Sequence, residues 1–326
     1  MLLLNIVVLI AGFFALIKGA DVFVDGSAAL AKNFKIPTLI IGLTVAAMGT
    51  SAPELAVSVS AGLQGANEIA FSNVVGSNLF NLLVVLGACA VIIPLPVGPV
   101  ALKRDYPVSI AVTLFVLAAV GGNAILSGEL LKSDMYDNVG AVTRPVAGIL
   151  IAVFAAYILY LIIDAKRNPA PDDGEIAKMS NVKCFAFIVI GLVLIVVGGK
   201  AVVYAARELA LAAGVSETLV GLTVVALGTS LPELVTSIVA ARKGEMDLAV
   251  GNVIGSNIFN IMLILGVSAS LRPIAVNAAS VYDTAILAAV SILAYIFCVS
   301  RRRINRIEGA VFLAAYTAAV VFAAVR

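Results

Sequence analysis

The chain has 326 residues, of which 62% are hydrophobic and 12% are charged, and its mean hydropathy is +1.13. Ordinary soluble domains contain about 45–50% apolar and about 25% charged residues, so this composition excludes a typical soluble fold. The formal net charge of +2 does not suggest a nucleic-acid partner, and the absence of histidine removes the usual zinc ligand and near-neutral proton carrier.

Apolar segments follow one another along nearly the whole chain. Each is close to the roughly 20 residues that a helix needs to cross about 30 Å of hydrocarbon. The segments contain Gly and Ala and lack the strict alternation of apolar and polar residues that is typical of β-barrel strands. We therefore predict an all-α membrane protein with ten transmembrane helices. The expected spans are residues 2–30, 36–63, 69–93, 106–127, 142–164, 184–210, 216–241, 247–271, 281–300 and 307–325.

The only long polar stretch, residues 165–183, divides the ten segments into five and five. We predict a first five-helix repeat at 1–164, a cytoplasmic linker at 165–183 and a second five-helix repeat at 184–326. With the N-terminus outside, 14 of the 21 Lys and Arg residues fall in cytoplasmic loops and 5 fall outside. Because cytoplasmic loops carry the excess of positive charge, we expect a multi-pass cell-membrane protein with both termini outside.

An internal repeat is the strongest pattern in the sequence. Residues 42–83 align without a gap with residues 221–262, at an offset of 179, and 22 of the 42 positions are identical. The shared blocks read GTSAPEL and GTSLPEL, then NVVGSNLFN and NVIGSNIFN. Since each half has an odd number of crossings, the second copy enters the membrane from the opposite side. The repeats are therefore expected to be inverted, with an ion site near the bilayer midplane where their interrupted helices meet.

Two glutamates lie deep in the repeated segments, Glu54 in the first half and Glu233 at the matching position of the second. An ionised carboxylate at the bilayer centre costs on the order of 2.5–3.5 kcal/mol, so such a residue indicates function. The basic residues inside segments, Lys18 and Lys200, lie outside the repeated block, which argues against a structural ion pair with the glutamates. An effect on gating is open for Lys18, Asp21 and Asp25 of the first segment and for Lys200 of the sixth. We expect instead that these residues form salt bridges or extend toward an interface.

Residues with side-chain oxygens lie close to both glutamates in the sequence. A threonine lies one helical turn before each glutamate and a serine follows that threonine, while a polar stripe at four-residue spacing runs along the next helix. Pro53 and Pro232 lack an amide hydrogen, so they kink the helix and free backbone carbonyls. Besides Glu54 and Glu233, the predicted ligands are Ala47 and Ala226 through their carbonyls, and Thr50, Ser51, Ser77, Asn81, Thr229, Ser230, Ser256 and Asn260. For Asn73, Asn78, Asn252 and Asn257 we expect a packing role.

Carboxylate, hydroxyl, amide and backbone oxygens, without sulfur or imidazole, are ligands for a hard cation. Calcium takes about 6–8 such oxygens, and sodium accepts the same ligands. Two negative charges match one calcium ion, whereas each sodium ion neutralises only one of them. The pattern thus predicts exchange by competition, with Ca²⁺ and Na⁺ as substrates.

Both blocks resemble the α-repeats of the sodium/calcium exchangers in the cation/calcium exchanger superfamily, and the ten-segment plan with a short linker resembles the prokaryotic members. The resemblance implies that the predicted ligands line the ion sites and that exchange is electrogenic. We expect access to alternate between the two sides as the first and sixth segments move against the core. Asn260 stands where relatives often carry Asp, notably potassium-dependent exchangers and some prokaryotic sodium/calcium exchangers, so potassium dependence is less favoured. The GNxxE-type motif of the proton/calcium branch is absent at both sites.

Other functions remain open at this stage. A proton- or potassium-coupled calcium antiporter would use a similar site, and a passive cation channel could use the carboxylates for selectivity alone. An enzyme is the least favoured class, because no second catalytic motif accompanies the glutamates. We expect no cofactor and no protein partner. We expect the lipid bilayer to surround the helices.

Overall fold

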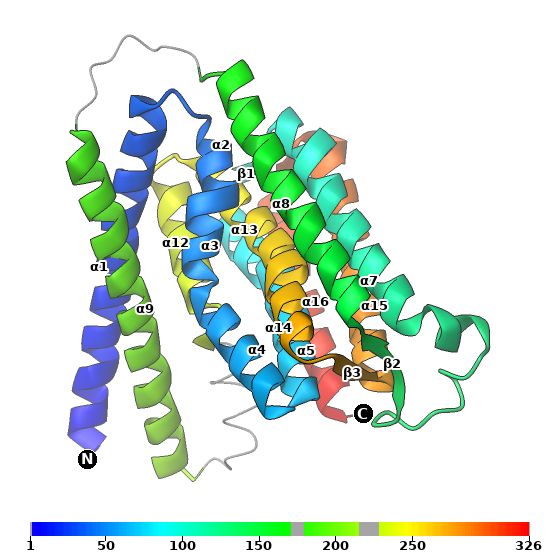
Figure 1. Cartoon of the computed structure of the whole chain (residues 1–326). Helices are drawn as coiled ribbons and strands as arrows, with labels where there is room; N and C mark the ends of the chain where they lie inside the picture. Colours follow the sequence, from blue (N-terminus) through cyan, green and yellow to red (C-terminus); the bar gives the residue numbers. More distant parts are fainter. Residues whose placement is uncertain (1, 171–178, 215–227, 326) are drawn as a thin grey trace. The chain divides into compact units, whose positions relative to one another are not determined.

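The computed structural model describes residues 2–170, 179–214 and 228–325, which are predominantly helical as the composition predicts (Figure 1). Within these residues, seven helices are long and apolar enough to cross a membrane. A pair of shorter helices, Thr38–Thr50 and Ala52–Gln64, would make an eighth span that is broken at Ser51. The predicted segment 216–241 lies partly outside the described residues.

Each half of the sequence supplies a series of helices, several of which contain a turn of π-helix (η). The first half contains α1 (Leu2–Asn33), α2 (Thr38–Ile41), η1 (Gly42–Ala46), α3 (Ala47–Thr50), α4 (Ala52–Gln64), α5 (Asn67–Phe80), η2 (Asn81–Val85), α6 (Leu86–Ile92), η3 (Ala101–Asp105), α7 (Tyr106–Leu126) and α8 (Arg144–Arg167). The second half contains α9 (Asn181–Ala212), α12 (Leu231–Arg242), α13 (Met246–Phe259), η5 (Asn260–Ile264), α14 (Leu265–Leu271), α15 (Ala278–Arg301) and α16 (Arg306–Val325).

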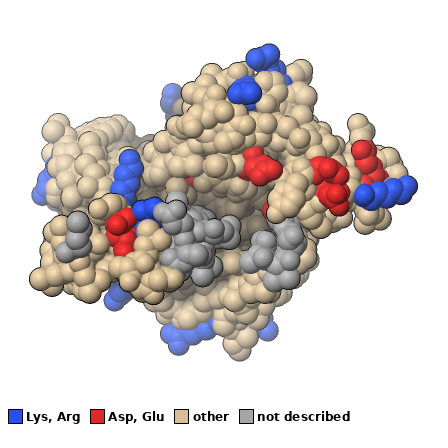
Figure 2. Space-filling view, turned by 90° about the horizontal axis from the view of Figure 1, so that it is seen from below, with Lys and Arg blue, Asp and Glu red and all other residues tan. Residues whose placement is uncertain are grey.

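Large apolar side chains lie on the outside of these helices, including those of Phe14, Val189 and Phe322. On the face seen in the space-filling view, charged side chains form small separate groups on a surface that is otherwise uncharged (Figure 2). Exposed apolar side chains such as those of Phe14, Val189 and Phe322 suit hydrocarbon. Helices suit it too, because they satisfy their backbone hydrogen bonds internally.

The chain divides into two compact units, and each combines helices from both halves of the sequence. Unit 1 comprises Met1–Pro53 and Ile163–Val253, and unit 2 comprises Glu54–Ile162 and Ile254–Arg326. Unit 1 therefore contains α1 with α9, and unit 2 contains α7 and α8 with α15 and α16.

In unit 1, glycines bring the long helices α1 and α9 together (Figure 1). Glycines recur every seven residues on α1 at Gly12, Gly19 and Gly26, and on α9 at Gly191 and Gly198. A Cβ atom on Gly191 would lie 2.6 Å from the backbone nitrogen of Phe23, and one on Gly198 would lie 2.6 Å from that of Leu16. The two backbones are therefore in direct contact, as small residues permit in membrane helices.

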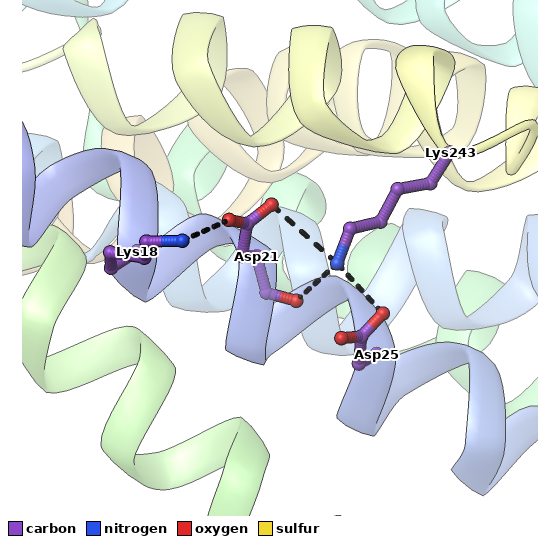
Figure 3. A network of polar contacts seen from close by, with 4 residues as sticks. All are labelled: Lys18, Asp21, Asp25 and Lys243. Atoms are coloured by element: carbon purple, nitrogen blue, oxygen red, sulfur yellow. Dashed lines mark hydrogen bonds and ion pairs between the residues drawn. The ribbon is translucent and has the colours of Figure 1, made fainter.

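A network of ion pairs also joins α1 to the C-terminal end of α12 (Figure 3). The Lys243 Nζ atom lies 2.7 Å from Asp25 Oδ1 and 3.5 Å from Asp21 Oδ1, and it donates to the Asp21 carbonyl oxygen at 2.9 Å. Lys18 pairs with the other oxygen of Asp21 at 3.6 Å. The salt bridges expected for these residues of α1 are confirmed. Since the side chains are partly exposed, each pair contributes about 0–1 kcal/mol to stability.

Unit 2 contains two short antiparallel strand pairs that the sequence did not predict. β1 (Leu95–Pro96) pairs with β4 (Arg303–Ile304), and β2 (Asn138–Val142) pairs with β3 (Ile274–Asn277). Each pair joins a strand of the first half to a strand of the second. Strands of two to five residues are too short for the period-two alternation by which a sequence predicts them.

Candidate cation-binding site

Both predicted carboxylates lie in the first turn of a helix that starts immediately after a backbone break. Ser51 (φ −82°, ψ 10°) separates α3 from α4, which carries Glu54, and Ser230 (φ −93°, ψ 5°) precedes α12, which carries Glu233. A proline follows each break by two residues, where its missing N–H costs nothing because the first turn of a helix has no intrahelical acceptor for it. The partial positive charge at a helix N-terminus stabilises a carboxylate in this position.

Glu233 in unit 1 is fully buried, and the hydroxyl of Ser51 donates a hydrogen bond of 2.7 Å to its Oε1 atom. These two residues come from opposite repeats, so the repeats meet at this carboxylate. Its Oε2 atom is buried and has no hydrogen-bond partner among the described residues. A buried carboxylate is costly unless a positive charge is close to it.

Glu54 in unit 2 is also fully buried. The hydroxyl of Ser77, one helix further along the chain, lies 3.3 Å from its Oε1 atom. The amide of Asn73 donates to the backbone carbonyl of Glu54 at 3.2 Å, which fixes α4 against α5. Each carboxylate is thus contacted by a serine hydroxyl from another helix.

The first asparagine of the polar stripe has the same partner in each unit. Asn73 donates to Ser58 Oγ at 2.8 Å in unit 2, and Asn252 donates to Ser237 Oγ at 2.9 Å in unit 1. Both pairs are related by the offset of 179. Asn252 Oδ1 also lies 3.2 Å from the hydroxyl of Thr50. These bonds hold consecutive helices together, which is the packing role expected of Asn73 and Asn252.

Four further asparagines form a reciprocal network in unit 2. Asn78 Nδ2 donates to the backbone carbonyl of Asn257 at 3.1 Å, and Asn257 Nδ2 donates to that of Asn78 at 3.4 Å. Asn81 Nδ2 donates to Asn257 Oδ1 at 3.2 Å, and Asn260 Nδ2 donates to Asn78 Oδ1 at 3.0 Å. All four side chains are buried. The sequence predicted packing for Asn78 and Asn257 but not this pairing across the repeats.

A turn of π-helix begins at each of the two predicted amide ligands. η2 starts at Asn81 and η5 starts at Asn260. In unit 1, η1 lies directly before α3, which begins at Ala47. Single π-helical turns inside α-helices occur frequently at functional sites, because they change the direction of side chains and carbonyls.

The other predicted ligands have the following environments. The Ala47 carbonyl accepts the N–H of Ser51 at 3.0 Å and lies 3.5 Å from the Thr50 hydroxyl. The hydroxyls of Thr229 and Ser256 are buried, without a hydrogen-bond partner among the described residues. Ser230 is buried, and Ala226 lies outside the described residues.

The structure therefore brings the predicted ligands together in two groups. Ser51 contacts Glu233 in unit 1, while Ser77 contacts both Glu54 and Asn260 in unit 2. Both groups present carboxylate and hydroxyl oxygens, and the group in unit 2 adds the amides of Asn81 and Asn260. The described residues contain no cluster of three or more His, Cys, Asp or Glu side chains. Neutral oxygens with a single carboxylate in each group suit an alkali or alkaline-earth cation better than a transition metal.

Comparisons with known proteins agree with this chemistry. The family model described as sodium/calcium exchanger protein matches residues 4–163 and 183–325. CaxA of Alkalimonas amylolytica is 37% identical over 97% of each chain, and the sodium/calcium exchanger MaX1 of Methanosarcina acetivorans is 33% identical over 98% of this chain and 99% of its own. A structure of the sodium-calcium exchanger NCX_Mj soaked with Na⁺ and Ca²⁺ superposes with a TM-score of 0.82, at 30% identity, and covers 98% of this chain and 99% of its own.

Proposed function

This chain belongs to the sodium/calcium exchanger family, and from that premise we propose that it exchanges sodium for calcium across the cell membrane by alternating access. One observation carries the proposal: a fully buried carboxylate of one repeat, Glu233, receives the hydroxyl of Ser51 from the other repeat. Glu233 forms no ion pair with a basic side chain in the residues that the structure describes. A bound cation would supply the missing positive charge.

We further propose that Glu54 and Glu233 are the charged ligands of the transported ion. The other ligands would be Ala47, Thr50, Ser51, Ser77, Asn81, Ala226, Thr229, Ser230, Ser256 and Asn260. Two carboxylates balance one calcium ion, so calcium and several sodium ions compete for the same oxygens. An extra sodium ion beyond the two that balance calcium would make the exchange electrogenic.

The membrane arrangement that we propose has ten transmembrane helices in two inverted five-helix repeats. Both termini lie outside and the linker 165–183 is cytoplasmic. The reciprocal bonds of Asn78 with Asn257 support the inverted arrangement, because they pair equivalent residues of the two halves. So do the strand pairs, each of which joins one half to the other.

Coupling follows from the cost of an empty site. Two ionised carboxylates without a bound cation repel each other and lose their hydration, so the empty protein reorients poorly. We propose that α1 and α9, which are packed backbone to backbone, move as one rigid pair when access alternates. Ions would then cross only in exchange for other ions.

Calcium uptake into proteoliposomes under an opposed sodium gradient tests this function. Wild-type protein should take up calcium when the lumen contains sodium, and should not respond to an imposed proton or potassium gradient alone. Glu54→Gln should reduce uptake to that of empty liposomes, because it removes one of the two charges. Glu129→Gln, at an exposed position between helices, is the matched control and should retain uptake.

Uptake that follows the calcium gradient and ignores sodium would contradict antiport and favour a channel. Uptake driven by a proton or potassium gradient would contradict sodium as the coupling ion. Unchanged uptake by Glu54→Gln would contradict the assignment of this carboxylate.

A further inference from the structure

We propose that Asn78 and Asn257 are positioning residues: they orient the side-chain amides of Asn260 and Asn81 so that the carbonyl oxygens of these amides face the transported cation. This inference rests on the proposed function, since it assigns the ligands of the same site their orientation. It concerns residues whose side chains donate and accept hydrogen bonds within the network and which are not themselves proposed as ligands.

The first step of the argument is the orientation of Asn78 and Asn257. Each side chain lies within hydrogen-bond distance of the other residue's backbone carbonyl, at 3.1 Å and 3.4 Å. A backbone carbonyl can only accept, so the group that faces it must be the NH₂ group. The two backbone carbonyls therefore determine which atom of each side-chain amide is nitrogen and which is oxygen. This assignment follows from the hydrogen bonds themselves.

The second step transfers this orientation to the neighbouring amides. The Oδ1 atom of Asn257 can only accept, so the group of Asn81 that lies 3.2 Å from it must also be NH₂. The same reasoning applies to Asn260, which lies 3.0 Å from Asn78 Oδ1. The Oδ1 atoms of the two predicted ligands, Asn81 and Asn260, are therefore on the side of each amide that faces away from Asn78 and Asn257.

The third step is the environment of the two remaining oxygens. Asn81 Oδ1 and Asn260 Oδ1 are both buried, and neither has a hydrogen-bond partner among the described residues. Burying a polar oxygen without a partner costs free energy, and a cation beside it would remove that cost. If the amide rotated by half a turn, the hydrogens of its NH₂ group would replace the oxygen and would repel a cation.

The asparagine side chain meets two requirements at positions 78 and 257. The side chain must donate to a backbone carbonyl and accept from a neighbouring amide at the same time. Leucine has the same number of side-chain heavy atoms and the same branching but can do neither, and aspartate can only accept. The occurrence of the same arrangement twice, at an offset of 179, shows that it is built into both repeats.

A double-mutant cycle distinguishes a positioning role of Asn78 from a purely structural role. Asn260→Asp replaces the amide ligand by a carboxylate, whose two oxygens are equivalent, so that this ligand needs no orientation by residue 78. Asn78→Leu should raise the KM for calcium of sodium-driven uptake by about 10-fold, the effect of losing one oriented ligand. In the Asn260→Asp background, the same Asn78→Leu change should alter the KM by less than about 3-fold, since the ligand no longer depends on position 78.

An equal effect of Asn78→Leu in both backgrounds would overturn the inference, because a structural role does not depend on residue 260. The corresponding cycle, Asn257→Ala with and without Asn81→Asp, adds no volume to the buried network and gives a second test if Asn78→Leu does not fold. Sodium-driven calcium uptake by the wild type is measured first, and its absence would contradict the proposed function. Normal wild-type uptake, together with an equal effect of Asn78→Leu on the KM in both backgrounds, would contradict the positioning role alone.

Discussion

Ser51 and Glu233 are 182 positions apart in the chain, yet their side chains form a 2.7 Å hydrogen bond inside unit 1. A hydrogen bond to a charged group contributes about 1.5–3 kcal/mol, and the loss of its donor leaves the carboxylate oxygen buried without that partner. Ser51 is also one of the proposed cation ligands. Removal of the Ser51 hydroxyl should therefore weaken the site twice, because the carboxylate loses a hydrogen-bond donor and the cation loses a ligand.

Ser51→Ala is expected to lower the affinity for calcium by about 10-fold or more, which corresponds to at least about 1.4 kcal/mol. The apparent affinity can be measured as the calcium dependence of sodium-driven uptake. Ser291→Ala is the matched control, because Ser291 is a buried serine in α15 that donates only to the backbone of Leu287. Equal affinities of Ser51→Ala and the control would contradict a role of Ser51 at the carboxylate.

The sequence singled out candidate site residues because the repeat pairs each polar residue with a counterpart. Depth within an apolar segment singled out Glu54 and Glu233, and both are fully buried. Spacing alone could not predict which hydroxyl contacts which carboxylate, since the bond of Ser51 to Glu233 depends on tertiary packing. The same limit applies to Asn78 and Asn257, whose mutual bonds arise only where α5 and α13 meet.

At the scale of elements, local chemistry explains the helix breaks but not the π-helical turns. Proline two residues after Ser51 and Ser230 indicates the irregular backbone that the structure has there. The π-helical turns at Asn81 and Asn260 follow apolar, helix-compatible sequence and had no predictive signal. The short strands were missed because backbone pairing between two loops requires that the loops already lie side by side.

The contact between α1 and α9 is the element-scale feature that depends most on individual residues. A Cβ atom on Gly198 would lie 2.6 Å from one backbone atom and 2.8 Å from another, and neither can move without shifting α1. Gly198→Ala should therefore destabilise the protein by about 1–3 kcal/mol, the usual cost of overpacking. The measurement is thermal unfolding of the purified protein in detergent.

Gly148→Ala is the control for this change. Gly148 lies in α8, and an added Cβ atom there would have no neighbour within 4 Å. Its stability should be unchanged or slightly higher, because alanine favours a helix over glycine by about 0.8–1.0 kcal/mol. Unfolding of the two variants at the same temperature would contradict backbone-to-backbone packing of α1 on α9.

At the scale of the whole molecule, composition and segment length predicted the helical membrane architecture, since segments of about 20 apolar residues without alternation suit helices and not barrel strands. The boundaries of the two five-helix repeats, 1–164 and 184–326, remain predictions. The compact units do not follow these boundaries: each unit combines parts of both halves. The sequence repeats show which segments were duplicated, whereas the compact units show which helices pack together. The boundaries of the repeats and of the units need not coincide.

The central proposal is that the same cation binds to one carboxylate from each repeat, Glu54 and Glu233. Equilibrium calcium binding to purified protein, with sodium as competitor, tests it for wild type, Glu54→Gln and Glu233→Gln. A shared site predicts that sodium displaces calcium cooperatively and that either single variant weakens calcium binding by about 100-fold, as expected when one charge of a buried set is removed. If each variant instead kept half of the calcium sites at wild-type affinity, the two carboxylates would belong to separate sites and the account would be wrong.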